Sequence, residues 1–195
     1  ISGDTVSINV GSTTAAFSDR NVANGKSVSL TATALTGANA SNYTITLTGA
    51  PTASANITPK ELTIAGSFTA ENKVYNGNTT ATIASNSLTL TGLISGDTVS
   101  INTATAAVNF ADRNVGTAKV VSLSNATLTG ANASNYTITL TGAPTTTANI
   151  TPKELTIAGS FTADNKVYDG TTAATIASNS LTLAGLISGD TVSIN

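Results

Sequence analysis

Large apolar residues alternate with threonine or serine along most of the chain. The pattern is clearest at residues 62–64, 88–91, 98–101 and 136–140. A period of two places the apolar side chains on one face of a strand and the hydroxyls on the other. Threonine is β-branched and favours strands, and no window has a convincing apolar stripe of helical period. The pattern therefore predicts an all-β chain.

Turn signals separate these stretches at short intervals. The dipeptides Asn76-Gly77 and Asp169-Gly170 are typical of tight turns because these residues tolerate positive φ. The spacing predicts about eight or nine short strands in each unit, as in a two-layer sandwich. We expect five turn residues to shape the fold: Tyr75, Gly77, Tyr168, Asp169 and Gly170.

The chain is also a tandem repeat. Ile57–Ala70 returns letter for letter as Ile150–Ala163, an offset of 150 − 57 = 93 residues. Residues 1–93 and 94–186 differ at 23 positions, so 93 − 23 = 70 are identical. A period this long indicates small independent domains rather than solenoid coils.

The repeat predicts three segments in a tandem array of small β-sandwich-like domains. Residues 1–59 are the C-terminal part of one unit, residues 60–152 a complete unit, and residues 153–195 the N-terminal part of the next. We expect the chain to be an interior excerpt of a longer protein.

The connection between units has the composition of a stiff linker. Pro59 and Pro152 each follow a threonine between two β-like halves, and neither connection has the Gly/Ser-rich composition of a flexible linker. A proline also pushes the residue before it toward extended geometry. We therefore predict an elongated rod with little bending at these prolines.

The composition excludes most catalytic chemistry. The chain has neither histidine nor cysteine, so a Ser-His-Asp triad, a Cys-His pair or a zinc site cannot be built from its side chains. The complete unit carries only four acids, which the sequence assigns to solvated turns and strand ends: Glu61, Glu71, Asp97 and Asp112. We predict that the chain is not an enzyme and has no catalytic, cofactor-binding or metal-binding residues and no cofactor.

Charge and hydropathy narrow the range of partners. Lys and Arg number only 8 and the isoelectric point is about 4.8, which argues against nucleic acid. No apolar run approaches the ~18 residues of a membrane span. We predict neither nucleic-acid binding nor membrane insertion.

The only arginines follow aspartates, in Asp19-Arg20 and Asp112-Arg113. One interpretation is a structural ion pair or a loop clamp, since arginine offers several donors to backbone carbonyls. The other is a solvated turn that contributes little. Replacing Arg113 by alanine lowers the melting temperature only under the first interpretation.

One segment carries a family resemblance. The segment from Ala163 to Ala174 reads ADNKVYDGTTAA and resembles the signature of the YDG repeat domain, which is found in large bacterial surface proteins of the filamentous-haemagglutinin kind. The preceding residues 150–157 resemble the entry into such a unit. The first copy departs from the signature with Asn76 and Asn78, and both suit a turn. The resemblance implies an extracellular location on a bacterial cell surface and brings no catalytic residues.

These observations predict a structural module, the shaft of a repetitive adhesin or extracellular filament that projects a tip and bears tension. Its partners are then the neighbouring repeats of the same chain. One alternative is a weak multivalent module that binds glycans or a host surface, with repetition supplying avidity. Another is a self-associating repeat whose strand edges pair with other copies of the chain in cell–cell contact or filament assembly.

Overall fold

The computed structural model describes residues 1–194. These residues form twenty-one β-strands and three short 3-10 helices, with no α-helix among them. The all-β prediction is confirmed. The described residues divide into two compact units. Unit 1 comprises Ile1–Thr63, Leu90–Ser100 and Leu128–Thr139, and unit 2 comprises Ile64–Thr89, Ile101–Thr127 and the described residues from Leu140 onward.

Unit 1 is built from short strands and all three 3-10 turns. Some of its elements continue by one or two residues past the unit boundary. The elements are β1 (Ser7–Ile8), η1 (Val10–Ser12), β2 (Thr14–Phe17), β3 (Ala23–Ala32), β4 (Leu35–Thr36), η2 (Ala40–Asn42), β5 (Thr52–Ile57), β6 (Lys60–Ala65), β11 (Thr89–Thr91), β12 (Ser100–Ile101), β15 (Leu128–Thr129), η3 (Ala133–Asn135) and β16 (Tyr136–Thr139).

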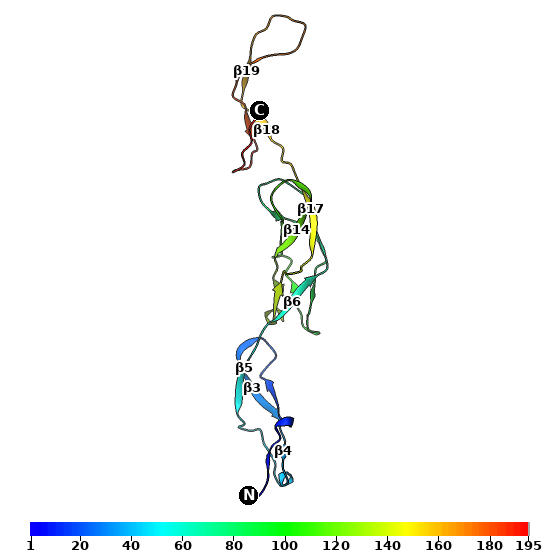
Figure 1. Ribbon diagram of the computed structural model, residues 1–195, viewed down its shortest axis with the longest axis vertical. Helices are drawn as coiled ribbons and strands as arrows, with labels where there is room; N and C mark the ends of the chain where they lie inside the picture. The colour runs from blue at the N-terminus through cyan, green and yellow to red at the C-terminus, as the bar shows by residue number, and fades with distance from the viewer. Residues whose placement is uncertain (195) are drawn as a thin grey trace. The chain divides into compact units, whose positions relative to one another are not determined.

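Four small sheets organise these elements. Strands β2, β3 and β5 form an antiparallel sheet, β1 pairs with β4, and β12 pairs with β15. Strand β6 lies between β11 and β16 and runs parallel to β16, with Lys60 opposite Tyr136. Figure 1 shows β3 and β5 side by side in the blue-to-cyan part of the chain. Only two residues, Thr58 and Pro59, separate β5 from β6.

Unit 2 contains the sheet with the most strands. Its strands are β7 (Phe68–Ala70), β8 (Lys73–Val74), β9 (Thr80–Ala81), β10 (Ile83–Asn86), β13 (Ala107–Phe110), β14 (Gly116–Asn125), β17 (Thr145–Thr151), β18 (Thr156–Ala158), β19 (Phe161–Ala163), β20 (Ile176–Asn179) and β21 (Thr182–Ala184).

A five-stranded sheet in the order β8-β17-β14-β13-β9 is the centre of unit 2. Strands β14 and β17 run side by side and antiparallel (Figure 1), whereas β8 and β17 are parallel, with Lys73 opposite Ile150. The pairs β7–β10, β18–β21 and β19–β20 are antiparallel.

The core is thin and lies mainly in unit 2. Eleven apolar side chains are buried among the described residues. Within the five-stranded sheet they recur at every second position, as 108 and 110 in β13, 121 and 123 in β14, and 148 and 150 in β17. This is the period of two that the sequence shows. Each large side chain of this kind contributes about 1.5–3 kcal/mol when fully buried. None of the described residues forms a helix long and apolar enough to cross a membrane.

Candidate functional site

The β2–β3 loop of unit 1 is held in shape by its own acid. Asp19 Oδ1 accepts hydrogen bonds from the backbone N–H of Asn21 at 2.8 Å and from the ammonium of Lys26. Lys26 Nζ also donates to the Asn21 carbonyl at 3.0 Å, and Lys26 is only 8% exposed. The Lys26 hydrogen bond, with the backbone bond second, lowers the pKa of Asp19. The loop presents Arg20 at its tip.

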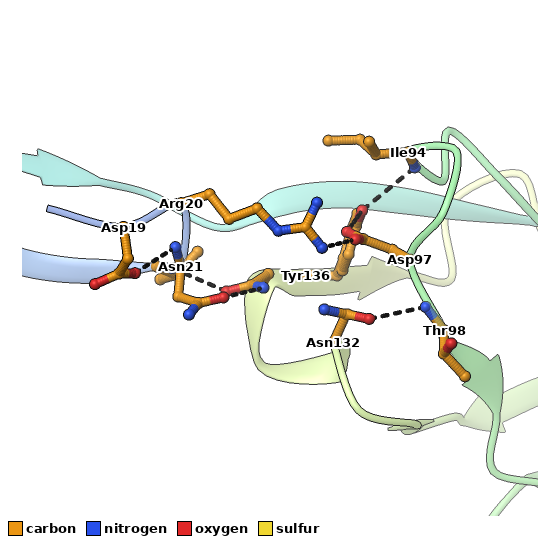
Figure 2. A network of polar contacts seen from close by, with 10 residues as sticks. Asp19, Arg20, Asn21, Ile94, Asp97, Thr98, Asn132 and Tyr136 are labelled. Atoms are coloured by element: carbon orange, nitrogen blue, oxygen red, sulfur yellow. Dashed lines mark hydrogen bonds and ion pairs between the residues drawn. The ribbon is translucent and has the colours of Figure 1, made fainter. Parts of the chain in front are cut away.

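Arg20 reaches a nearly buried carboxylate. Its Nη2 pairs with Asp97 Oδ1, and the Asp97 side chain is 5% exposed whereas that of Arg20 is 66% exposed. The Tyr136 hydroxyl donates to the other oxygen, Oδ2, at 2.6 Å and accepts from the Ile94 N–H at 3.3 Å (Figure 2). Burial first, and the bond to Asp97 second, raise the pKa of Tyr136. We call Arg20, Asp97 and Tyr136 the first clamp.

The assignment of Asp97 to a solvated turn was wrong. A buried carboxylate is stable only when charge and hydrogen bonds compensate for lost hydration. Here a guanidinium and a phenol supply that compensation from segments far apart in the sequence.

An asparagine adds two more bonds beside the first clamp. Asn135 Oδ1 accepts from the Val22 N–H at 2.8 Å, and its Nδ2 donates to Asn21 Oδ1 at 3.2 Å. Asn132, in the same turn, accepts from the Thr98 N–H at 2.9 Å (Figure 2). These contacts and the first clamp connect the β2–β3 loop with the start of β16, and so bridge the Thr58–Pro59 connection within unit 1.

Unit 2 contains a second clamp, made of Tyr75, Arg113 and Asp190. Arg113 Nη2 lies 3.3 Å from Asp190 Oδ1, and the Tyr75 hydroxyl donates to Oδ2 at 2.6 Å. The hydrogen bond to Asp190 is the main cause that raises the pKa of Tyr75. Arg113 and Asp190 each lie 93 residues after their counterparts in the first clamp, but the tyrosine comes from a different position.

Asp112 repeats the arrangement of Asp19. It accepts from Lys119 Nζ at 2.6 Å and from the Asn114 N–H at 2.7 Å. The Lys119 bond is the largest cause that lowers the pKa of Asp112. The Asp-Arg-Asn loop thus uses its aspartate to fix the turn and its arginine to reach another segment.

The two prolines occupy exposed positions in the backbone. Pro59 lies between β5 and β6, and Pro152 directly follows β17. Thr151, the residue before Pro152, makes two hydrogen bonds. Its carbonyl accepts from the Tyr75 N–H at 2.9 Å, and its hydroxyl donates to the Lys73 carbonyl at 3.3 Å. Both connections therefore continue directly from hydrogen-bonded strands.

Each clamp borders a small cavity. The first, of about 150 Å³, is lined in part by Arg20, Lys60 and Tyr136. The second, of about 170 Å³, is lined in part by Tyr75 and Pro152. Pockets for small molecules usually measure ~300–1,000 Å³, so these cavities do not fit a ligand of that size. Among residues 1–194 no group of acidic side chains could hold a metal ion.

A lysine organises both copies of the Tyr-Asx-Gly turn. Lys73 Nζ donates to Asn76 Oδ1 at 2.9 Å and to the Asn78 carbonyl at 2.7 Å. In the other copy, Lys166 Nζ lies 2.9 Å from Asp169 Oδ1. The Lys166 bond is the largest cause that lowers the pKa of Asp169. The lysine thus closes the loop in both copies, with an amide at Asn76 in one and an acid at Asp169 in the other.

The tyrosines and glycines of the two turns differ in their surroundings. Tyr75 belongs to the second clamp, whereas Tyr168 is 93% exposed. Gly77 has φ +80°, and a Cβ there would lie 2.7 Å from Ile187 Cγ2. Gly170 has φ +75° with open space around it.

The family comparison matches this chain three times. A family model described as the YDG domain matches residues 1–53, 58–148 and 151–195. The chain belongs to the YDG domain family. The matches cover both the Asn76 and the Asp169 form of the turn, and the breaks between them lie just before Pro59 and Pro152. No curated protein and no solved structure matches the chain.

Sequence reasoning missed several residues that hold these YDG domains together. They are Lys26, Lys73, Asp97, Lys119, Asn135, Lys166 and Asp190. The sequence carries a signal for them: only 9% of the chain is charged, and several of these lysines and acids recur at the offset of 93. Charged residues that are this rare and recur at the repeat distance indicate structural contacts.

Proposed function

We propose that this chain is a structural stalk module of a repetitive bacterial cell-surface adhesin or extracellular filament. Its segments 1–59, 60–152 and 153–195 are successive β-sandwich-like units of an elongated rod that projects a tip and bears tension. The observation that carries the proposal is the pair of clamps, which brace the polypeptide on both sides of the Thr-Pro connections.

The clamps favour stiffness over hinging. In unit 1 the Thr58–Pro59 connection is spanned by an arginine–aspartate pair and by both ends of the Asn135 amide. Bending there breaks several hydrogen bonds at once and exposes the Asp97 carboxylate and the Tyr136 hydroxyl. A Gly/Ser linker has no such resistance.

The strand order also suits tension. Load on residues 60–152 enters at the start of β6 and leaves at the end of β17. Strand β6 is parallel to β16, and β17 is parallel to β8. Pulling therefore slides parallel neighbours past each other, so that their evenly spaced hydrogen bonds bear the load together rather than one after another.

Single-molecule force spectroscopy tests the proposal. The chain has no cysteine, so cysteines added at the two ends are unique attachment points. We expect discrete unfolding events, with a release of up to roughly 330 Å for 93 residues at ~3.6 Å each. Smooth extension without discrete events would contradict a load-bearing role.

A control changes the direction of pulling and moves the load from the parallel strands to an antiparallel pair. Thr69 and Ser85 lie opposite each other in the β7–β10 pair, so handles placed on them open that pair one bond at a time. We expect this geometry to yield at a clearly lower force than pulling from the ends. Equal forces would remove the argument from parallel pairing.

A further inference from the structure

The Asn76-Gly77 turn stands where the other copy has Asp169-Gly170. Asparagine before glycine is chemically labile, because glycine has no side chain to hinder its backbone nitrogen. We propose that Asn76 is a site of non-enzymatic deamidation, which converts the first turn into the charged form that Asp169 already shows. This inference does not rest on the stalk proposal.

The reaction needs only water. The Gly77 nitrogen loses its proton and bonds to Asn76 Cγ, and the bond from Cγ to the side-chain nitrogen breaks. Ammonia leaves with that proton, and a succinimide ring remains. Water then cleaves the bond between Cγ and the Gly77 nitrogen, which restores the peptide bond and leaves a carboxylate at residue 76.

The structure activates this amide. Lys73 Nζ donates to Asn76 Oδ1 at 2.9 Å, so a positive charge draws electron density from the carbonyl whose carbon is attacked. Asn76 is exposed, and water can reach the ring.

The product fits the site better than the starting amide. Burial lowers the pKa of Lys73, whose ammonium has only neutral oxygens among the partners that the structure gives it and lies 5.3 Å from the Phe110 ring centroid. A carboxylate at residue 76 supplies the missing negative charge. The Lys166–Asp169 pair at 2.9 Å shows that the same loop accepts it, and Asp169 Oδ1 also accepts from the Thr171 N–H at 2.9 Å.

The chain contains a matched internal control, Asn24-Gly25. The Gly25 N–H donates to Asn56 Oδ1 at 2.8 Å within the β3–β5 region. Its nitrogen cannot attack Asn24 until that bond breaks. The two Asn-Gly pairs share the same local chemistry, and only the folded structure distinguishes them.

Peptide mapping by mass spectrometry tests the proposal on the whole chain. One sample is incubated folded and another in urea, both at mildly alkaline pH. In urea we expect Asn24 and Asn76 to convert at similar rates. In the folded protein we expect Asn76 to convert at least about fivefold faster than Asn24, the factor for one net hydrogen bond. The Asn56→Ala variant, which frees the Gly25 N–H, is expected to raise the rate at Asn24 without changing that at Asn76.

Three results overturn the proposal. The first is an intact Asn76 amide in the folded protein under conditions that convert it in urea. The second is equal deamidation rates at Asn24 and Asn76 in the folded protein. The third is isoaspartate rather than aspartate as the main product in the folded protein. The last result would mean that the loop does not reach the Asp169 form.

Discussion

Replacing Asp97 by alanine is the sharpest single perturbation of the first clamp. The Asp97 side chain is 5% exposed and accepts from both Arg20 and Tyr136. Its removal leaves a buried hydroxyl without its acceptor and an arginine without its counter-ion. The change should therefore open the region where β16 begins.

The magnitude follows from the burial of each partner. Loss of a hydrogen-bonded group from a buried site costs about 1–3 kcal/mol. Arg20 is 66% exposed, so in Arg20→Ala water can take the place of the guanidinium beside Asp97, and the Tyr136 hydrogen bond to Asp97 remains. The loss is then that of an exposed ion pair, ~0–1 kcal/mol. We expect Asp97→Ala to cost about 2 kcal/mol and Arg20→Ala no more than ~1 kcal/mol. At about 1.36 kcal/mol per factor of ten, these correspond to roughly thirtyfold and fivefold changes in an opening equilibrium.

Amide hydrogen exchange reads this opening locally. Protection at β16 and at the paired residues of β6 should fall about thirtyfold in Asp97→Ala and at most about fivefold in Arg20→Ala. Amides of β14, which contribute nothing to the first clamp, serve as the internal reference.

Two outcomes would be inconsistent with a clamp held by the buried Asp97 carboxylate. If Arg20→Ala lowers protection as much as Asp97→Ala, the exposed ion pair rather than the buried carboxylate holds the clamp. If neither variant changes protection at β16, the polar network does not stabilise this region.

Two further predictions concern the turns. Gly170→Ala should lower the free energy of unfolding by about 1–2 kcal/mol, because the backbone there is left-handed. Gly77→Ala should lower it clearly more, because the added Cβ would also lie 2.7 Å from Ile187 Cγ2. Equal melting temperatures of the two variants would show that this contact is not tight. The pKa of Asp112 is lowered from 3.8, mainly by Lys119, so its ion pair stabilises the folded state above pH 3.8 and loses that effect as pH falls toward the lowered pKa. Asp112→Asn should therefore show a smaller drop in melting temperature on acidification than the unmodified chain, and parallel pH profiles would contradict the assignment.

The regular part of the fold is readable from the sequence. Alternation predicts strands, and the buried side chains of β13, β14 and β17 recur with the predicted period of two. The strand count is less accessible. The pattern predicts eight or nine strands in residues 60–152, but the structure has twelve, β6 to β17. Two-residue strands such as β8 and β12 are too short to show an alternation.

The polar network could not be predicted from local patterns. Asp97 reads as a surface acid because its partners lie 77 residues before it and 39 residues after it. Parallel pairing of β6 with β16 is what brings Tyr136 beside the Thr58–Pro59 connection. Arg113 and Asp112, by contrast, are candidates from the sequence because arginine is rare in this chain. Local patterns do not reveal their separate partners, Asp190 and Lys119.

The first clamp and Asn135 connect the segments on both sides of Thr58–Pro59. Spin labels on cysteines at the exposed residues Ser54 and Thr129, both in unit 1, allow the distance across this connection to be measured by pulsed electron resonance. We predict one narrow distance distribution that broadens when Asp97 and Asn135 are both replaced by alanine. A distribution that is already broad in the unmodified chain, or one that these replacements leave narrow, would show that these residues do not brace the connection.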